Sequence, residues 1–330
     1  MKTIHKLKAG VACIVLLGLS AAPAHTAYNL TLCGASPGGL WSLLGAGIDA
    51  AVKAAYPGST VTYQTSGGGF ANVGQLQQKK CDLAIVHDAE AIAAVNGRTP
   101  FKEPVTNLRT VAVLYTWAPM QLILSKSFAD QHGVKSLEDI GTKKAPVRIL
   151  LNRRGNVASQ VGETMLDAAG IGRKDIEAWG GSVTFAASKE QGELMRDRRA
   201  DAILNSLFIN HRSIRQLAQA LELTLLPISD ATADKVIGEW KINKFSVPGD
   251  AYPWSPQPTP TVALSALLFV LDSADIRMVS DVTSALIKHV DKLQGVHKAM
   301  KPLSTKLMAS GTAVAYHPAA DNTYKAQGLR

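Results

Sequence analysis

Two glycine-rich segments near the start of the chain have the composition of an anion-binding site. They read Ser36-Pro37-Gly38-Gly39-Leu40-Trp41 and Ser66-Gly67-Gly68-Gly69-Phe70-Ala71-Asn72. Each follows a run typical of a β-strand and precedes a run typical of a helix. The first N–H groups of a helix have no partner inside the helix, so they attract an anion. The two segments therefore predict that backbone N–H groups hold a small anionic solute at the carboxyl ends of strands.

A third segment of the same kind lies in the middle of the chain. Arg153-Arg154-Gly155-Asn156 follows the predicted strand Val147–Leu151 and precedes a predicted helix that begins at Ser159. The guanidinium group of arginine is a planar set of donors that suits a carboxylate. Either at least one of the two arginines binds the solute or both are solvated. Their position at a strand end is where open α/β sheets bind ligands.

The sequence does not indicate catalysis or metal binding. It contains no His-Glu-x-x-His, no Cys-x-x-Cys and no phosphate loop that ends in Gly-Lys-Ser or Gly-Lys-Thr. Gly67-Gly68-Gly69 does not complete a dinucleotide-binding fingerprint, because Ala71-Asn72 stands where the last glycine is required. His87-Asp88, at the end of a predicted strand, is either a binding site or a solvated strand end. We expect a protein that is not an enzyme and has no cofactor and no metal.

The first residues have the pattern of a secretion signal. Lys2, Lys6 and Lys8 form a basic region, Ala9–Leu19 an apolar core, and Ala22-Pro23-Ala24 a cleavage site of small residues. The apolar core is shorter than the roughly 20 residues of a transmembrane helix. We therefore predict a signal peptide over residues 1–24, with cleavage possible as far as 27, and a soluble protein in the periplasm.

The charge of the chain argues against nucleic acid as a partner. The net charge of +9 includes the three lysines of the predicted signal, so +6 remains after cleavage. The basic residues are scattered, whereas nucleic-acid-binding proteins usually show a basic stripe with interleaved aromatic residues. We interpret the charge as a solubilising surface with a weak bias toward anions.

Two cysteines, Cys33 and Cys81, remain after the predicted cleavage. Cys33 ends the predicted strand Tyr28–Cys33, and Cys81 begins the predicted strand Cys81–Val86. In adjacent parallel strands the two sulfur atoms would lie at opposite ends, roughly 13 Å apart. This distance exceeds the roughly 7 Å between Cα atoms that a disulfide tolerates, so we predict no intramolecular disulfide.

Strand and helix patterns alternate along the rest of the chain, which is typical of an α/β protein with mostly parallel sheets. The apolar runs Leu108–Tyr115 and Met120–Leu124 are separated by Thr116-Trp117-Ala118-Pro119. This break suggests one strand that leaves a first lobe and another that enters a second. The proline-rich loop Tyr252–Pro260 and the apolar run Val262–Leu271 then return the chain to the first lobe. We predict a first lobe over residues 28–117 and 262–330 and a second over 118–261.

Around the three glycine-containing segments the chain resembles the TAXI-type solute receptors of tripartite ATP-independent periplasmic (TRAP) transporters. The family loops Gly-Gly-x-Tyr-Tyr-x-x-Gly and Thr-x-Gly-Ser-x-x-Asn correspond here to Gly38-Gly39-Leu40-Trp41-Ser42-Leu43-Leu44-Gly45 and Ser66-Gly67-Gly68-Gly69-Phe70-Ala71-Asn72. Later landmarks are Gly155-Asn156-Val157, Arg199-Ala200-Asp201-Ala202, Tyr252-Pro253 and His317-Pro318-Ala319-Ala320. Gly69 and Asn156-Val157 lack hydroxyl groups that relatives offer to a bound carboxylate, so we expect a different or larger anion than a short amino-dicarboxylate or keto acid.

The resemblance implies a two-lobed, type II-like periplasmic binding protein that closes a cleft around its solute. It implies a monomer that delivers a small organic anion, a carboxylate or an amino acid, to a fused TRAP permease in the membrane. Trp41 would pack either against the solute or in the core. The alternative function is a periplasmic sensor whose closed form is recognised by a signalling protein. The predicted binding residues are Ser36, Gly38, Gly39, Trp41, Ser66, Gly67, Gly68, Gly69, Asn72 and His87 from the first lobe, and Arg154, Asn156 and Asn205 from the second.

Overall fold

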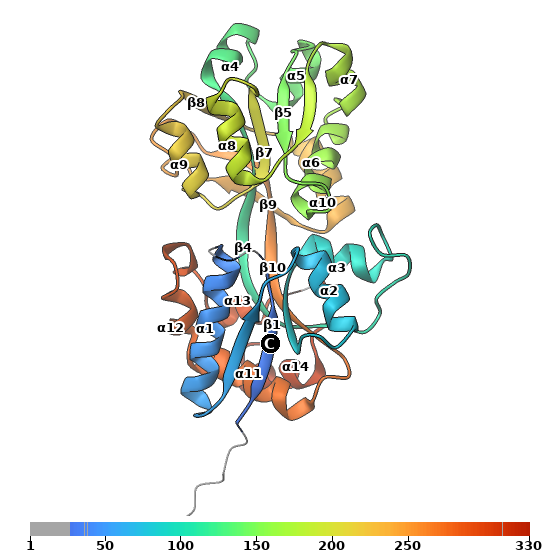
Figure 1. Ribbon diagram of the computed structural model, residues 1–330, viewed down its shortest axis with the longest axis vertical. Coiled ribbons are helices and arrows are strands. Elements are labelled where there is room, and N and C mark those ends of the chain that lie inside the picture. The colour runs from blue at the N-terminus through green and yellow to red at the C-terminus, as the bar shows by residue number, and fades with distance from the viewer. Residues whose placement is uncertain (1–26, 36, 38, 312) are drawn as a thin grey trace, which may run out of the picture.

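The computed structural model describes residues 27–35, 37, 39–311 and 313–330 (Figure 1). The predicted signal peptide, Ser36 and Gly38 lie outside the described residues. Strands and helices alternate through the first two thirds of the described chain. The strands are β1 (Asn29–Cys33), β2 (Thr60–Gln64), β3 (Leu83–His87), β4 (Leu108–Ser125), β5 (Arg148–Leu151), β6 (Ser182–Phe185), β7 (Ala202–Ser206), β8 (Leu223–Leu226), β9 (Asn243–Val247) and β10 (Thr259–Leu271).

The helices fall into two groups in space. Figure 1 shows α1 to α3 and α11 to α14 around the lower part of the molecule and α4 to α10 around the upper part. The lower group is α1 (Leu40–Ala55), α2 (Gly69–Gln77), α3 (Asp88–Val95), α11 (Ile276–Lys288), α12 (Val290–Gln294), the 3-10 helix η1 (Lys298–Met300), α13 (Thr305–Met308) and α14 (Pro318–Ala326). The upper group is α4 (Lys126–His132), α5 (Leu137–Thr142), α6 (Val157–Ala168), α7 (Arg173–Ala178), α8 (Ser188–Arg196), α9 (Arg212–Ala218) and α10 (Asp230–Trp240).

The strands form two sheets that share β4 and lie one above the other. In the lower sheet β1 pairs in parallel with β2 and β3, and β10 pairs antiparallel with β3, β4 and β9. In the upper sheet β5 pairs in parallel with β6 and β7, and β4 pairs antiparallel with β7 and β8. We name the two parts the lower lobe and the upper lobe. The expected fold class, an α/β protein with two lobes, is confirmed; the residue boundaries of the lobes stay a prediction.

The long strands β4 and β10 run between the lobes (Figure 1). The expectation that Thr116–Pro119 breaks the chain into two strands is wrong, because β4 is continuous through this segment. Pro119 sits where β4 changes partners: up to this residue it pairs with β10, and from Met120 onward with β7. The carbonyl of Pro119 accepts a hydrogen bond from the Leu207 N–H (3.2 Å). A proline is tolerated in a strand where no partner needs its missing N–H.

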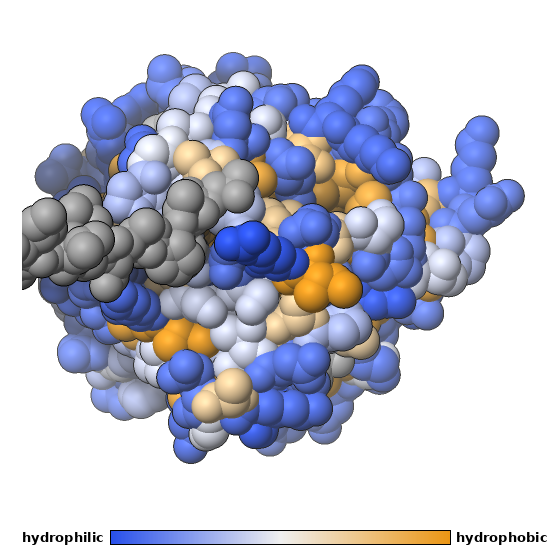
Figure 2. Space-filling model, turned by 90° about the horizontal axis from the view of Figure 1, so that it is seen from below, coloured by the Kyte–Doolittle hydropathy of each residue, from blue (hydrophilic) through white to orange (hydrophobic). Residues whose placement is uncertain are grey.

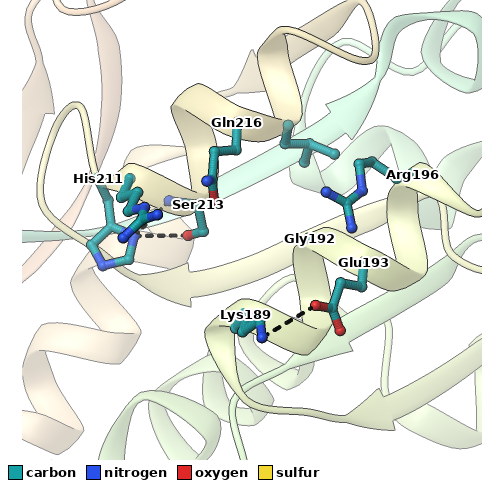
Figure 3. A pocket seen from close by; sticks show the side chains of 9 residues that line it. Lys189, Gly192, Glu193, Arg196, His211, Ser213 and Gln216 are labelled. Atoms are coloured by element: carbon teal, nitrogen blue, oxygen red, sulfur yellow. Dashed lines mark hydrogen bonds and ion pairs between the residues drawn. The ribbon is translucent and has the colours of Figure 1, made fainter.

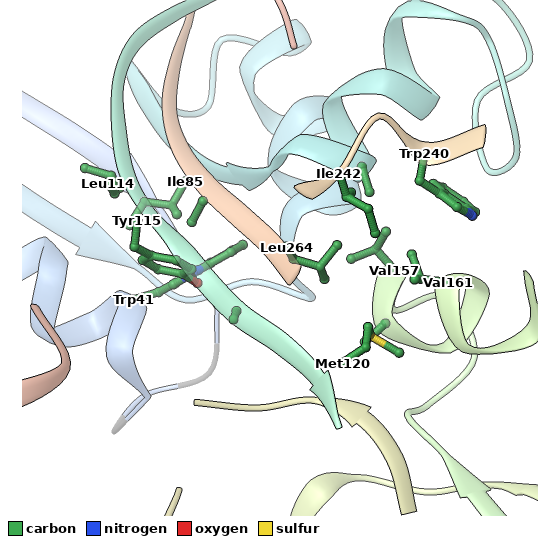
Figure 4. Packing of buried hydrophobic residues seen from close by; sticks show 14 of the residues in the cluster. Trp41, Ile85, Leu114, Tyr115, Met120, Val157, Val161, Trp240, Ile242 and Leu264 are labelled. Atoms are coloured by element: carbon green, nitrogen blue, oxygen red, sulfur yellow. The ribbon is translucent and has the colours of Figure 1, made fainter. Parts of the chain in front are cut away.

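Apolar side chains continue from the lower lobe into the upper lobe along the crossing strands. Figure 4 shows Trp41 and Tyr115 packed at one side of this cluster and Met120, Val157 and Trp240 at the other. Burial of such side chains is the main stabilising contribution to folding, at roughly 25 cal/mol per Å² of apolar surface. The crossing region is therefore a packed core rather than a loose linker.

Cys33 and Cys81 form a disulfide, with Cα atoms 5.8 Å apart, so the prediction of no disulfide is wrong. The prediction assumed that Cys81 begins a regular strand, whereas β3 begins at Leu83. Cys81 lies in the turn that leads from α2 into β3. Because it is not part of the strand, its distance from Cys33 is not set by the regular spacing of residues along paired parallel strands. The bond joins the end of β1, directly before the first glycine-rich segment, to the start of β3.

Within the part of the chain that the structure describes, none of the helices combines the length and apolar character that a bilayer crossing requires. Figure 2 views the molecule from below and shows a mainly hydrophilic face with small, separate apolar patches.

Candidate functional site

A cavity of about 280 Å³ lies between the lobes and takes its walls from both. The lower lobe contributes residues at the starts of α1, α2 and α3, and the upper lobe contributes residues after β5 and β7 and at the start of α6 and α8. The lining residues are Ala35, Gly39, Leu40, Trp41, Gly68, Gly69, His87, Glu90, Tyr115, Ala118, Asn152, Asn156, Ala158, Ser188, Ser206, Leu207, Phe208, His211 and Leu264. The cavity thus lies at the carboxyl ends of strands, where ligands bind in open α/β sheets.

The first glycine-rich segment is anchored by Tyr63 of β2. The Tyr63 hydroxyl accepts a hydrogen bond from the Ala35 N–H (2.6 Å) and donates one to the Ala35 carbonyl (3.1 Å). Gly34 lets the ring approach, because a Cβ atom at this position would lie 2.2 Å from the ring. Tyr63 therefore sets the direction in which the chain leaves β1 toward the cavity.

The second segment is held by Ser66 and Asn72, whose side chains bond to neighbouring backbone. The Ser66 hydroxyl bonds to the Gly34 carbonyl and the Asn72 side chain, and it accepts from the Gly68 N–H (3.0 Å). Asn72 is fully buried and donates to the Ile85 carbonyl (2.7 Å). Gly68 has a φ of +112°, a conformation that favours glycine. Ser66 and Asn72 thus fix the loop on which Gly68 and Gly69 line the cavity.

Aromatic side chains form one wall of the cavity. The Trp41 and His87 rings lie 4.8 Å apart, and the Trp41 indole N–H donates to the Tyr115 hydroxyl (2.9 Å). Phe208, from the upper lobe, meets the Tyr115 ring edge-on at 5.1 Å. Burial raises the pKa of Tyr115 far above its usual range, so its hydroxyl stays protonated. Trp41 was expected either in the core or against the solute. Its side chain is buried in the core and also lines the cavity, so the two positions do not exclude each other.

His87 and Glu90 bring a pair of hydrogen-bonded side chains to the floor of the cavity. Oε2 of Glu90 accepts from the His87 N–H (3.0 Å) and lies 3.2 Å from His87 Nδ1. Such a contact between the residue before a helix and the third helical residue is a capping box. The Glu90 side chain is only 3% exposed. A Cβ atom on Gly69 would lie 1.7 Å from Glu90 Oε2, so the glycine makes room for this carboxylate.

Asn205 organises the opposite wall without reaching the cavity. Its side chain is fully buried, accepts from Asn152 Nδ2 (3.1 Å) and donates to Ser188 Oγ (3.1 Å) and Gln191 Oε1 (2.9 Å). Asn152 and Ser188 line the cavity. Asn156 also lines it and caps α6, accepting from the Ala158 N–H (2.9 Å). Asn205 therefore acts on the cavity through its neighbours.

The arginines of the third segment do not line the cavity. Arg154 stacks on the Phe185 ring, with 3.8 Å from Cζ to the ring centroid. Among the described residues of the lining there is no lysine or arginine. His211 does line it; burial and the charge of Arg215 lower its pKa, so this side chain is neutral at pH 7.

Asp88 follows His87 in the chain, but its side chain does not line the cavity between the lobes. It lines a small hollow of about 100 Å³ behind the crossing strands, with Lys241, Asn243 and Ser265 among its neighbours. Its carboxylate accepts from the N–H groups of Ala89 (2.8 Å) and Ser265 (3.1 Å). Burial raises the pKa of Asp88 to about 6, against the opposing effect of these hydrogen bonds.

Six of the thirteen predicted binding residues therefore lie in the lining: Gly39, Trp41, Gly68, Gly69, His87 and Asn156. Ser66, Gly67, Asn72, Arg154 and Asn205 lie outside it, and Ser36 and Gly38 lie outside the described residues. Sequence reasoning missed Glu90, Tyr115, Asn152, Ser188 and Phe208. Glu90 had a signal, because a glutamate three residues after the end of a strand is typical of a capping box; Asn152 directly follows a predicted strand.

A second hollow lies between α8 and α9 (Figure 3). Its labelled side chains include Lys189, Glu193, Arg196 and Gln216, and Lys189 lies 3.7 Å from Glu193. All of its lining comes from the upper lobe, and one of these residues, His211, also lines the cavity between the lobes. A movement of one lobe against the other would not enclose this hollow. In the ranges that the structure describes, no three His, Cys, Asp or Glu side chains are grouped so that they could hold a metal ion.

Comparison with solved structures supports the fold. The chain is similar to a TctC solute binding protein from Polaromonas (TM-score 0.54, 15% identity), with 92% of this chain and 97% of that chain covered. It is also similar to MatC from Rhodopseudomonas palustris with bound malate (0.55, 12%; 92% and 96%) and to PhnD1 from Prochlorococcus marinus in complex with methylphosphonate (0.53, 12%; 92% and 99%). At these identities the likeness shows the fold alone.

The sequence itself matches one family model over nearly its whole described length. The match covers residues 32–328, from β1 to the turn that follows α14. It includes every segment that lines the cavity. The chain belongs to the NMT1-like family.

Proposed function

We propose that this protein is an extracytoplasmic receptor that captures a small organic solute between its lobes. The observation that carries the proposal is the cavity whose walls come from both lobes, at the carboxyl ends of β1, β3, β5 and β7. Such a cavity can be entered when the lobes are apart and closed when they approach. The apolar wall with a few polar groups is typical of small-molecule sites.

Capture would proceed by a change in the angle between the lobes. Within the described chain, β4 and β10 are the strands that run between the lobes, so bending of these two strands changes the opening (Figure 1). A solute that touches both walls binds the closed form better and shifts the population toward it. The Arg98 guanidinium donates to the Glu239 carbonyl (3.0 Å), a contact between the lobes that can form and break with this motion.

The bound solute would be an organic acid or, in better agreement with the lining, an amino acid. The start of α2 at Gly68 and Gly69 and the start of α6 at Asn156 supply N–H groups for a carboxylate. A solute with negative groups only would meet the carboxylate of Glu90 without a compensating lysine or arginine in the described lining. An amino acid carries a positive group for that carboxylate.

The partner in the membrane would be a TRAP-type permease, and the protein would act in the periplasm as a TAXI-type receptor. These statements rest on the resemblance of the glycine-containing loops and on the predicted signal peptide. A permease gene beside the gene of this chain would support them, and a sensor kinase gene in that place would favour the sensor function instead.

We propose binding without catalysis. Gly34-Ala35-Ser36-Pro37-Gly38 has the Gly-x-Ser-x-Gly spacing of serine hydrolases, and Ala35 lines the cavity together with the His87–Glu90 pair. Ser36 itself lies outside the described residues. We expect that 4-nitrophenyl acetate is hydrolysed at the same rate by the protein and by a Ser36→Ala variant. Turnover that is lost in this variant would contradict the proposal.

The test of receptor function is a thermal shift of the mature protein, stripped of solute by unfolding and refolding. The panel contains carboxylates, amino acids, amines and neutral solutes. Binding to the native state raises stability by about 2.7 kcal/mol at 100 times the dissociation constant. We expect a hit that Asn152→Ala weakens and Gln216→Ala, in the second hollow, leaves unchanged. No shift with any compound would contradict the proposed function.

A further inference from the structure

We infer that Glu90 is the receptor group for a positively charged nitrogen of the solute, and that this nitrogen, rather than a carboxylate, is what the site requires. The inference rests on the proposed receptor function and names the substrate class of the same cavity. That class is a small amine with an apolar or aromatic body.

The first reason is the balance of charge in the cavity. Glu90 is a carboxylate with a side chain 3% exposed, and the described lining holds no lysine or arginine beside it. His211, in the upper wall, is neutral at pH 7 because burial lowers its pKa. His87, the other imidazole of the described lining, approaches the Glu90 carboxylate at Oε2 alone. Bringing an anion to such a place costs free energy because like charges repel at low dielectric constant. A cation is attracted for the same reason.

The second reason is the free bonding capacity of the carboxylate. Both groups of His87 that approach Glu90, the backbone N–H and Nδ1, lie at the same oxygen, Oε2. Oε1 of Glu90 accepts no hydrogen bond from a described residue. Among the described residues, this oxygen is not one of the buried polar atoms without a partner, so it is accessible, and an ammonium group offers three donors. The carboxylate is thus held in position through one oxygen and available through the other.

The third reason is the aromatic wall beside the carboxylate. Trp41, Tyr115 and Phe208 face the same cavity as Glu90 (Figure 4 shows Trp41 against Tyr115). The indole N–H of Trp41 is used by the Tyr115 hydroxyl, so the indole meets the solute through its ring. A cation near an aromatic face is attracted by the negative face of the ring. These rings also accommodate an apolar body at the other end of the solute.

The space around Glu90 is set by Gly69. A side chain at position 69 would overlap the carboxylate, since a Cβ atom there would lie 1.7 Å from Oε2. Gly69 lies in the lining itself, so the second glycine-rich segment exposes the carboxylate to the cavity as well as presenting N–H groups. The two features together suit a solute with a nitrogen cation and, optionally, a carboxylate at the far side.

The experiment compares three probes that share one body: 2-phenylethylamine with only the positive group, phenylalanine with both groups, and 3-phenylpropionate with only the negative group. Affinities are measured by isothermal titration calorimetry at pH 7 on the refolded mature protein. We expect the amine and phenylalanine to bind at least tenfold more tightly than 3-phenylpropionate. Equal or tighter binding of 3-phenylpropionate would overturn the inference.

The variant Glu90→Gln separates recognition from a structural role. Glutamine keeps the size of the side chain and can still accept from the His87 N–H, as in other capping boxes. We expect the affinity for 2-phenylethylamine to fall at least tenfold and that for 3-phenylpropionate to stay equal or rise. Glu90→Asp keeps the charge and should retain part of the affinity for the amine. An unchanged affinity for the amine in Glu90→Gln would show a structural role only and overturn the inference.

The two proposals fail in different ways. If none of the three probes binds but an organic anion from the thermal-shift panel does, the inference is overturned and the receptor function stands. If no compound of either set binds, both are contradicted. Gln216→Ala serves as the control, because this residue lies in the second hollow and should leave all three affinities unchanged.

Discussion

At the scale of single residues, the contact between Gly69 and Glu90 links the shape of a loop to the charge of the cavity. A helix begins at Gly69, and its first residue has no conformational need for glycine there. The need comes from the carboxylate of Glu90, three residues into the next helix. Gly68, by contrast, is required by its own backbone, with a φ of +112°. Neighbouring glycines thus serve different purposes.

Gly69→Ala should displace the Glu90 carboxylate and weaken the binding of 2-phenylethylamine about tenfold or more, with little loss of stability, because alanine suits a helix start. The matched control is Gly74→Ala in the same helix, where an added Cβ atom meets nothing within 4 Å. This control should leave binding unchanged and raise stability by about 0.5–1 kcal/mol. Titration calorimetry and urea unfolding of both variants measure the two effects. Equal affinities in the two variants would contradict the assignment of Gly69.

Asp88 should make the protein less stable as the pH rises. Burial raises its pKa from 3.8 to about 6, so the folded state holds this proton more tightly than the unfolded state. The stabilising effect is complete below pH 4 and is lost between about pH 4 and 6. A shift of this size corresponds to the order of 3 kcal/mol.

The test for Asp88 compares urea unfolding of the protein and of Asp88→Asn between pH 4 and 7.5. Asparagine does not titrate, so the variant should not lose this stability. The free energy of unfolding of the variant minus that of the unmutated protein should therefore increase as the pH rises through this window. A difference that stays constant across the window would contradict the assignment to Asp88.

At the scale of elements, the cavity is built where strands end and helices begin, and the sequence predicted most of these places. The strands β1, β3 and β5 begin and end within two residues of the expected positions, because their apolar residues and the glycines that flank them are local signals. The crossing strand β4 was divided by its Thr116–Pro119 segment, since proline is a strong local break signal and its tolerance depends on a distant partner. Two short helices were not predicted because their apolar periodicity is weak: α3, which carries Glu90, and α9, which begins directly after His211.

The disulfide between Cys33 and Cys81 should stabilise the elements beneath the cavity. It closes a loop of 48 residues between the end of β1 and the start of β3, and a loop of this size corresponds to about 2–4 kcal/mol. The double variant Cys33→Ser/Cys81→Ser should lose this free energy in urea unfolding.

A thiol titration of the unfolded, unreduced mature protein checks the bond directly. We expect no free thiol, because Cys33 and Cys81 are the cysteines left after the predicted cleavage. Two free thiols per chain would contradict the bond.

At the scale of the whole molecule, two lobes share a packed crossing region (Figures 1 and 4). A cavity lined by both lobes lies next to this region. The buried side chains along β4 and β10 keep the lobes coupled, while the contact of Arg98 with Glu239 can open and close. Motion is therefore expected as rotation about these strands rather than as separation of the lobes.

Small-angle X-ray scattering should show this rotation. Saturation with 2-phenylethylamine is expected to lower the radius of gyration without a change in the molecular mass. At an amine concentration that just saturates the protein, Glu90→Gln should keep a larger radius, because its affinity for the amine is at least tenfold lower and a smaller fraction of it is bound. An unchanged radius in the protein at proven saturation would contradict closure.

By itself, the sequence determined the α/β class, the return of the chain through a proline-rich loop and the positions of the glycine-rich segments before helices. Each of these depends on patterns within ten to twenty neighbouring residues, which local backbone preferences decide. The tertiary structure alone decided that Cys33 meets Cys81, that Arg154 stacks on Phe185 away from the cavity, and that Gly69 faces Glu90. These contacts join residues that local patterns do not relate, and they exist because the packing of strands and helices brings separate segments together.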